Sequence, residues 1–164
     1  MFYTGSHKPI GFSKIPDALL AFYAKMKVYD SQCDIIIGTD SQNHSDTKIV
    51  SVIAAVCQGH GGIFFYQITH EPKIQNVKQK LQKETGYSLT LACELIDELE
   101  KNERFEDMYC SCPISIHIDA GNSEKGKTKE LISELVGWVK ACNFQACVKP
   151  GSYVASTIAD KISK

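Results

Sequence analysis

The alternation of apolar and polar positions predicts three β-strands in the first half of the chain. Asp34 to Asp40 is an almost continuous apolar run, which is typical of a central strand buried on both faces. Two further runs, rich in β-branched and aromatic residues, follow at 48–57 and 63–69. Short, turn-rich connections separate the three runs, so the pattern indicates an antiparallel meander.

After Pro72 the apolar positions take up the period of helices that alternate with short strands. The elements expected here are a long amphipathic helix at 77–100, a strand at 114–119, a helix at 128–142, a strand at 144–148 and a terminal helix from Ser152 to Lys164. A further helix opens at Pro16 and ends before Tyr29. This order predicts an α/β fold with a five-stranded mixed sheet, flanked by helices, in which the first three strands are antiparallel.

Length and composition limit the domain organisation and the mode of nucleic-acid binding, and they leave the predicted fold unchanged. At 164 residues, 43% hydrophobic and 23% charged, the chain is expected to form one domain over residues 1–164, with residues 1–30 as an N-terminal helical extension. A formal net charge of -1 gives no bulk attraction to nucleic acid, so any polyanion must be bound by a local patch. The pattern specifies no oligomeric state.

The cysteines and the apolar runs indicate a cytoplasmic protein. Seven cysteines without paired metal spacing fit a reducing compartment, and no disulfide partner is expected. The longest apolar stretch, 49–57, is far below the ~20 residues that cross a bilayer, and no signal-peptide pattern precedes it. We therefore expect no membrane association.

Two acids stand where acids are costly. Asp40 ends the apolar run Ile35–Thr39, and Asp119 ends the run Ile114–Ile118. Ligand sites in sheets with parallel neighbours usually lie at such strand ends. Two carboxylates at adjacent ends repel each other unless a cation or a shared proton compensates, and a divalent ion with oxygen ligands is the natural partner. Alternatively, either acid alone is a turn former or a helix cap.

The long helix offers a third acid. Its apolar stripe consists of Leu81, Ser88, Leu91, Ala92, Leu95 and Leu99. Glu84 falls about 40° from the centre of this stripe, whereas Glu94 falls about 120° away on the solvent side. Glu84 is thus the helix acid expected to point toward the sheet.

The motifs resemble those of a known family. The segment IIIGTDSQ at 35–42 resembles the first-strand signature of ribonuclease-H-like proteins. Four further segments resemble the YkuK-type bacterial members of that superfamily: GGIFFY from Gly61, KETGYSLTLACEL from Lys83, HIDAG from His117 and KPGSYVASTIADK from Lys149. The resemblance covers nearly the whole chain from Asp34 onward and implies a five-stranded mixed sheet.

The resemblance also implies a site and an activity. Active members of the superfamily hold two divalent ions, Mg²⁺ or Mn²⁺, with carboxylates and cleave phosphodiesters. By position, the catalytic and metal-binding residues are Asp40, Glu84, Asp119 and Asp160, the substrate is RNA or an RNA–DNA hybrid, and Lys149 contacts a substrate phosphate. Asp160 points away from the apolar face of its helix, so it either reaches the site from the helix edge or is surface charge.

Two other functions stay open. The segment from Gly121 to Thr128 matches the G-x-x-x-x-G-K-[ST] pattern of a phosphate-binding loop, after a strand and before a helix. Its late position in the chain and the preceding Asp119 argue against nucleotide binding. The second alternative is a domain of the same fold that binds nucleic acid or protein without cutting.

Overall fold

A mixed sheet organises the part of the chain that the computed structural model describes, residues 1–120 and 126–163. Its centre is a meander of long strands, β3 (Cys33–Asn43), β4 (Thr47–Cys57) and β5 (Gly61–Glu71), paired antiparallel. Two parallel strands, β6 (Ile114–Ile118) and β7 (Gln145–Val148), extend the sheet beyond β3. The antiparallel meander and the parallel addition confirm the predicted mixed sheet.

The predicted count of five strands is wrong, because the described chain forms seven. Two short strands from the N-terminal segment, β1 (Phe2–Thr4) and β2 (Pro9–Ile10), join the free edge of β5 and give the order β2-β1-β5-β4-β3-β6-β7. Runs of two and three residues are too short to show a two-residue period. The extension at 1–30 is therefore part strand and part helix.

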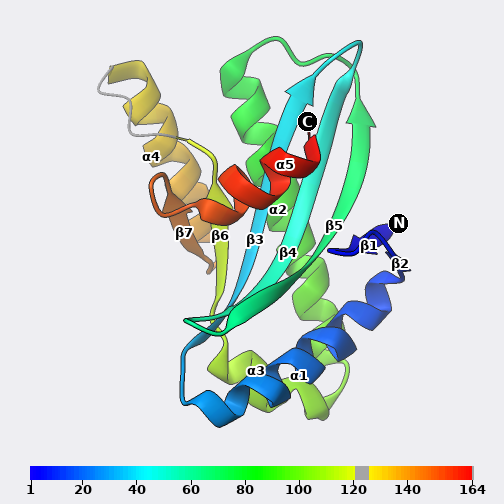
Figure 1. Ribbon diagram of the computed structural model, residues 1–164. Coiled ribbons are helices and arrows are strands. Elements are labelled where there is room, and N and C mark those ends of the chain that lie inside the picture. Colours follow the sequence, from blue (N-terminus) through cyan, green and yellow to red (C-terminus); the bar gives the residue numbers. More distant parts are fainter. Residues whose placement is uncertain (121–125, 164) are drawn as a thin grey trace.

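Helices cover both faces of the sheet (Figure 1). The α-helices are α1 (Ile15–Met26), α2 (Val77–Glu100), α3 (Glu106–Ser111), α4 (Gly126–Ala141) and α5 (Asp160–Ser163). Short 3₁₀ turns lie at Phe12–Lys14, Lys27–Tyr29 and Glu103–Phe105, and a π-helical turn at Val154–Ala159 leads into α5. The two long helices α2 and α4 lie on one side of the sheet, and α5 crosses the other. No helix among these described residues is long and apolar enough to cross a membrane.

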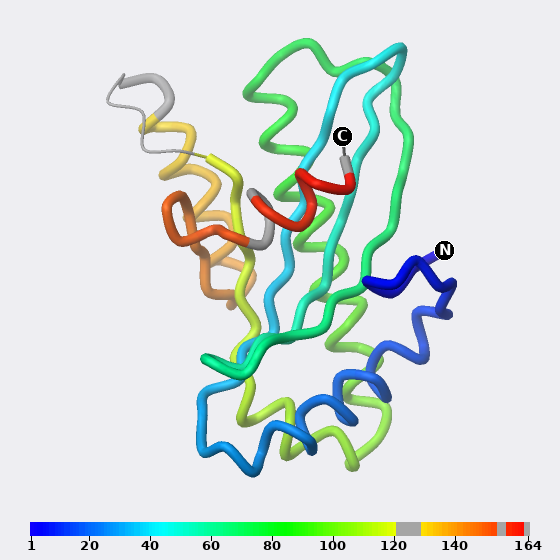
Figure 2. The backbone as a smooth tube through the Cα atoms, viewed as in Figure 1, coloured from blue at the N-terminus to red at the C-terminus, as the bar shows by residue number. Residues whose placement is uncertain are grey.

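Alternation along β3 divides the core into two parts. Ile35 and Ile37 pack on the α2 side, in a cluster that includes Leu95, whereas Ile36 packs on the opposite side with Ala159. Figure 2 traces the C-terminal segment across this second face, while the N-terminus lies beside β5. The terminal segment is fastened there by the Lys48 ammonium, which donates to the Ile162 carbonyl at 2.6 Å.

A hydrogen-bonded clamp holds the tip of the β3–β4 hairpin. The Asn43 amide donates to the Ile74 carbonyl at 2.7 Å, and the Thr47 hydroxyl donates to the Asn43 side-chain oxygen at 2.7 Å. The Ile74 backbone N–H then donates to the Thr47 hydroxyl at 2.8 Å. The tip is thereby joined to the segment that leads into α2, whose first turn is capped by Asn76.

Candidate acidic site

The prediction that Asp40 ends its strand is wrong, because Asp40 lies inside β3. The strand continues to Asn43 because these extra residues pair with the start of β4, with Ser41 opposite Ile49. The parallel pairing with β6, however, stops at Gly38 opposite His117. Asp40 therefore lies just past the parallel part of the sheet, and it is half-buried.

Ser41, the next residue, points to the other face and anchors the helix acid. Its hydroxyl donates to Glu84 Oε1 at 2.6 Å, and Glu84 is only 5% exposed. The inward orientation that the stripe predicts for Glu84 is confirmed, whereas Glu94 is exposed. Thr39, two residues before Ser41, contacts Ser88 at 2.8 Å, so two buried polar contacts fix α2 against β3.

Burial makes Glu84 a weak acid. Loss of water around the carboxyl is the main cause that raises its pKa to about 7, and the negative charges of Asp40 and Asp119 add to it. The Ser41 hydroxyl and the Lys80 ammonium, 3.9 Å from Glu84 Oε1, act in the opposite direction. Glu84 thus lies within electrostatic reach of both strand acids and of one ammonium group, that of Lys80.

Asp119 and Lys149 are brought together by the register of the two parallel strands. Ile118 pairs with Val148, and Asp119 and Lys149 are the residues that follow. Lys149 Nζ lies 2.6 Å from Asp119 Oδ1. Contact with Asp119 raises the pKa of Lys149, and Asp40 and Asp160 act in the same direction.

The sequence-predicted acids influence two charged groups, Glu84 and Lys149. Asp40 and Asp119 act on Glu84, and Asp40, Asp119 and Asp160 act on Lys149. Asp160 is half-buried at the start of α5, on the face of the sheet opposite α2. Glu84 and Asp160 thus come from helices on opposite faces of the sheet, and Asp40 and Asp119 come from β3 and from the end of β6.

The donor chemistry fits a divalent ion, but the arrangement is not a ready-made ligand set. Carboxylate oxygens such as those of Asp40, Glu84 and Asp119 are the ligands that Mg²⁺ and Mn²⁺ prefer. Within the described ranges, however, no three His, Cys, Asp or Glu side chains stand close enough together to hold an ion. The Lys149 ammonium is already in contact with Asp119.

Two contributors to the site were missed in the sequence. Ser41 and Lys80 both contact Glu84, one by a hydrogen bond and one by charge. A polar residue directly after Asp40 in a buried strand is the signal for Ser41, because alternation turns it toward the helix side. Lys80 lies one helical turn before Glu84, a spacing that brings side chains together.

His117 of β6 is a core residue. It is 4% exposed and meets Tyr153 edge to face, with ring centroids 5.1 Å apart. Burial lowers its pKa to about 4, so the imidazole is neutral at physiological pH.

The rival phosphate-loop segment, Gly121 to Thr128, lies largely outside the described residues. Positions 121–125 belong to the part of the chain that is not described. The helix that the motif requires is present, because α4 begins at Gly126.

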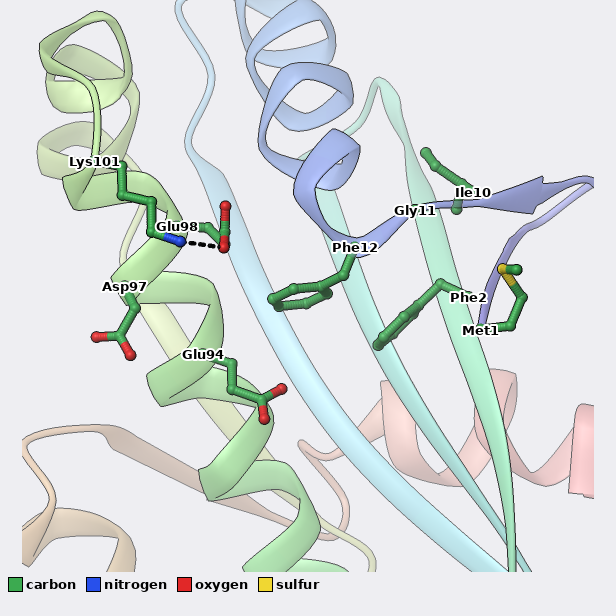
Figure 3. Close-up of a pocket in the computed structure, with 9 residues that line it drawn as sticks. All are labelled: Met1, Phe2, Ile10, Gly11, Phe12, Glu94, Asp97, Glu98 and Lys101. Atoms are coloured by element: carbon green, nitrogen blue, oxygen red, sulfur yellow. Dashed lines mark hydrogen bonds and ion pairs between the residues drawn. The ribbon is translucent and has the colours of Figure 1, made fainter.

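A hollow lies away from the four sequence-predicted acids. It measures about 480 Å³ and separates the N-terminal strands from the C-terminal half of α2 (Figure 3). Phe2, Ile10 and Phe12 line one side, and Glu94 and other α2 residues line the opposite side. Glu94 lies ten residues beyond Glu84, or about 15 Å along the helix. This hollow is therefore separate from the acidic cluster.

The chain belongs to the ribonuclease H-like family, whose model matches residues 17–164. Among curated proteins, it is similar to the uncharacterised protein YkuK of Bacillus subtilis (strain 168). The two are 29% identical over 172 residues, an alignment that covers 100% of this chain and 97% of the relative. The resemblance found in the motifs is thus confirmed. No solved structure gives a match.

Proposed function

We propose that this chain is a cytoplasmic, metal-dependent nuclease that hydrolyses phosphodiester bonds in RNA or RNA–DNA hybrids. The observation that carries the proposal is that Asp40 and Asp119 lie within electrostatic reach of Glu84, a buried carboxyl that accepts a hydrogen bond from Ser41. Such a concentration of negative charge is unfavourable unless a cation compensates it. Membership of the ribonuclease H-like family supports a nucleic-acid substrate.

In this proposal the acids and their polar neighbours have different roles. Asp40, Glu84, Asp119 and Asp160 are the residues that would hold two Mg²⁺ or Mn²⁺ ions. The ions, when bound, supply an activated water and stabilise the leaving oxygen of the phosphodiester. Ser41 keeps the Glu84 carboxylate oriented by its 2.6 Å hydrogen bond, and Lys149 contacts a substrate phosphate.

A cleavage assay with paired variants tests the proposal. Labelled RNA, RNA–DNA hybrid and single-stranded DNA are incubated with the purified protein in Mg²⁺ or Mn²⁺. We expect Asp40→Asn and Glu84→Gln to lose at least about 100-fold in rate, a typical loss for groups that hold the reacting centre. Glu94→Gln is the matched control, because it makes the same change on the exposed side of α2.

The cleavage rates of these variants decide whether the active centre lies at the acids. Cleavage that survives in Asp40→Asn and Glu84→Gln as in Glu94→Gln would refute an active centre at these acids. Specific binding of the nucleic acid with no cleavage in either metal would instead support the non-catalytic module. The Lys149–Asp119 ion pair favours that second candidate, since a lysine already compensates one of the acids.

A further inference from the structure

The hollow between the N-terminal strands and α2 has two chemically different walls (Figure 3). Phe2, Ile10 and Phe12 form an apolar wall, and the ring centroids of Phe2 and Phe12 lie 5.3 Å apart. Glu94 and Asp97 of α2 stand on the opposite wall, and both residues are exposed. The hollow therefore offers an apolar surface and negative charge to the same occupant.

Part of the acidic wall is already neutralised. Lys101 Nζ lies 2.5 Å from Glu98 Oε1, and both residues line the hollow on the α2 side. Within residues 1–120 and 126–163, by contrast, no ion pair engages Glu94 or Asp97. The wall thus keeps two carboxylates for basic groups from outside the fold.

The apolar wall is open to an occupant. Met1, which also lines the hollow, is 79% exposed, and Ile10 and Phe12 are half-buried. At Gly11, between these two, nothing lies within 4 Å of an added Cβ. Apolar side chains that gather at one exposed place and are rimmed by charge are typical of interaction sites.

The spacing of the two carboxylates fits an extended segment. Glu94 and Asp97 are three residues apart, roughly 4.5 Å along the helix axis. In an extended chain, residues i and i+2 point to the same side about 6.8 Å apart, while residue i+1 points to the opposite side. The long stems of lysine and arginine cover the difference between these spacings. A basic–apolar–basic sequence can therefore direct both cations at the carboxylates and its apolar side chain at Phe12.

We propose that this hollow is a docking groove for an extended basic segment of a protein partner, in which one apolar residue stands between two lysines or arginines. The apolar residue packs on Phe2, Ile10 and Phe12, and the two cations pair with Glu94 and Asp97. Charge complementarity favours this occupant over a nucleic acid, whose phosphates the carboxylates would repel. The inference is independent of the nuclease proposal, because the groove lies away from the four sequence-predicted acids.

Fluorescence anisotropy with labelled peptides and the intact chain tests the inference. The probe is a short peptide that contains Arg-Leu-Arg, and the two matched peptides contain Glu-Leu-Glu and Arg-Ser-Arg. The probe is expected to bind, and its affinity is expected to fall as the salt concentration rises. Both matched peptides are expected to bind at least about tenfold more weakly, since one lacks the cations and the other the apolar side chain.

Three variants locate the binding. Asp97→Lys reverses one charge of the groove and is expected to weaken binding of the Arg-Leu-Arg peptide by about three- to tenfold. Phe12→Ala removes part of the apolar wall and is expected to weaken it by about fivefold or more. Glu100→Lys makes the same charge reversal at an exposed position of α2 that does not line the groove, and it is expected to match the wild type.

Equal binding of the three peptides, or of the probe to the wild type and Asp97→Lys, would overturn the inference and leave the nuclease proposal intact. Displacement of the probe by phenethylamine at an equal concentration would also overturn it, because the hollow would then be a site for a small organic cation. Dimerisation of the wild type that Phe12→Ala abolishes, measured by sedimentation, would assign the groove to a second copy of this chain instead.

Discussion

At the scale of the residue, Glu84 is the costliest side chain of the site. A carboxyl that is 5% exposed loses most of its hydration, and its one close neutral partner, Ser41, replaces only part of it. The apolar stripe of α2 packs on the sheet, and this apolar burial offsets the cost of burying Glu84, which lies in the same stripe. A buried carboxyl whose pKa is raised toward 7 is characteristic of functional sites, and its burial does not stabilise the fold.

The pH dependence of stability is expected to report this cost. The pKa of Glu84 is about 7 in the folded protein against 4.5 for an ordinary glutamate, so the folded state binds more protons between these values. Stability contributed by the neutral carboxyl is therefore present below about pH 4.5 and lost as the pH rises toward 7. As the pH rises from 5 to 8, the free energy of unfolding of Glu84→Gln is expected to increase by up to about 3 kcal/mol relative to that of the wild type. Urea unfolding in chelator at both pH values measures this gain, and Glu94→Gln is expected to show none.

The neighbours of Glu84 are expected to shift its pKa in opposite directions. Asp40→Asn removes a repelling charge and should lower the pKa, whereas Ser41→Ala removes a hydrogen bond to the ionised form and should raise it. Carboxyl ¹³C NMR titration of metal-free protein measures both shifts. Asp97→Asn, on the exposed face of the same helix, is the control. A pKa that stays unchanged in Asp40→Asn would mean that the two acids are too far apart to interact.

At the scale of the element, long patterns were predictable and short ones were not. The helix expected at 77–100 is observed as Val77–Glu100, because nearly seven turns of consistent period leave little ambiguity. The strands β1 and β2 and the six-residue helix α3 were missed, since none is long enough to display a period. Their existence depends on partners distant in the sequence, such as Tyr66 for Tyr3.

The same distinction holds for the acidic site. Burial of Glu84 follows from the stripe of α2, which is a local pattern. Contact between Asp119 and Lys149 depends on the register of β6 against β7, and that register is fixed by packing across the whole sheet. The burial of Glu84 could therefore be predicted from the sequence alone, whereas the contact between Asp119 and Lys149 could not.

The β4–β5 hairpin contains a glycine whose replacement is expected to be costly. A Cβ added at Gly62 would lie 2.6 Å from the Ala55 carbonyl oxygen, a backbone atom that cannot move aside easily. Gly62→Ala is expected to lower the free energy of unfolding by about 1–3 kcal/mol. At Gly11, by contrast, nothing lies within 4 Å of an added Cβ, so Gly11→Ala is expected to be neutral or slightly stabilising. Chemical denaturation compares the two, and equal stability of both variants would contradict the expected clash.

At the scale of the whole molecule, the N-terminal segment shares the main core. Ile15 and Leu19 of α1 are 0% and 1% exposed and belong to the same apolar cluster as Ile35 and Leu95. Phe2 of β1 is 5% exposed and packs in that cluster too. Residues 1–30 therefore share their stabilising contacts with the sheet, and we expect the chain to unfold as one domain.

Native-state hydrogen exchange is expected to confirm a single cooperative unit. The slowest amides of α1 should exchange with the same free energy of opening as those of β4, because neither can open without exposing the shared core. A chain starting at residue 31 should be less stable, since it uncovers the edge of β5. An α1 that opens ~2 kcal/mol more easily than β4 would instead mark residues 1–30 as a separate unit.

The clamp at the tip of the β3–β4 hairpin couples this hairpin mechanically to the start of α2. Its arms are eleven residues each, roughly 35 Å of extended chain. Asn43 and Thr47 fasten the tip to Ile74, shortly before α2 begins. Glu84 lies seven residues into that helix, about 10 Å from its start. A force that bends the tip is therefore transmitted to the first turns of α2, and the position of the Glu84 carboxyl becomes mechanically sensitive to whatever touches a loop far from it in the sequence.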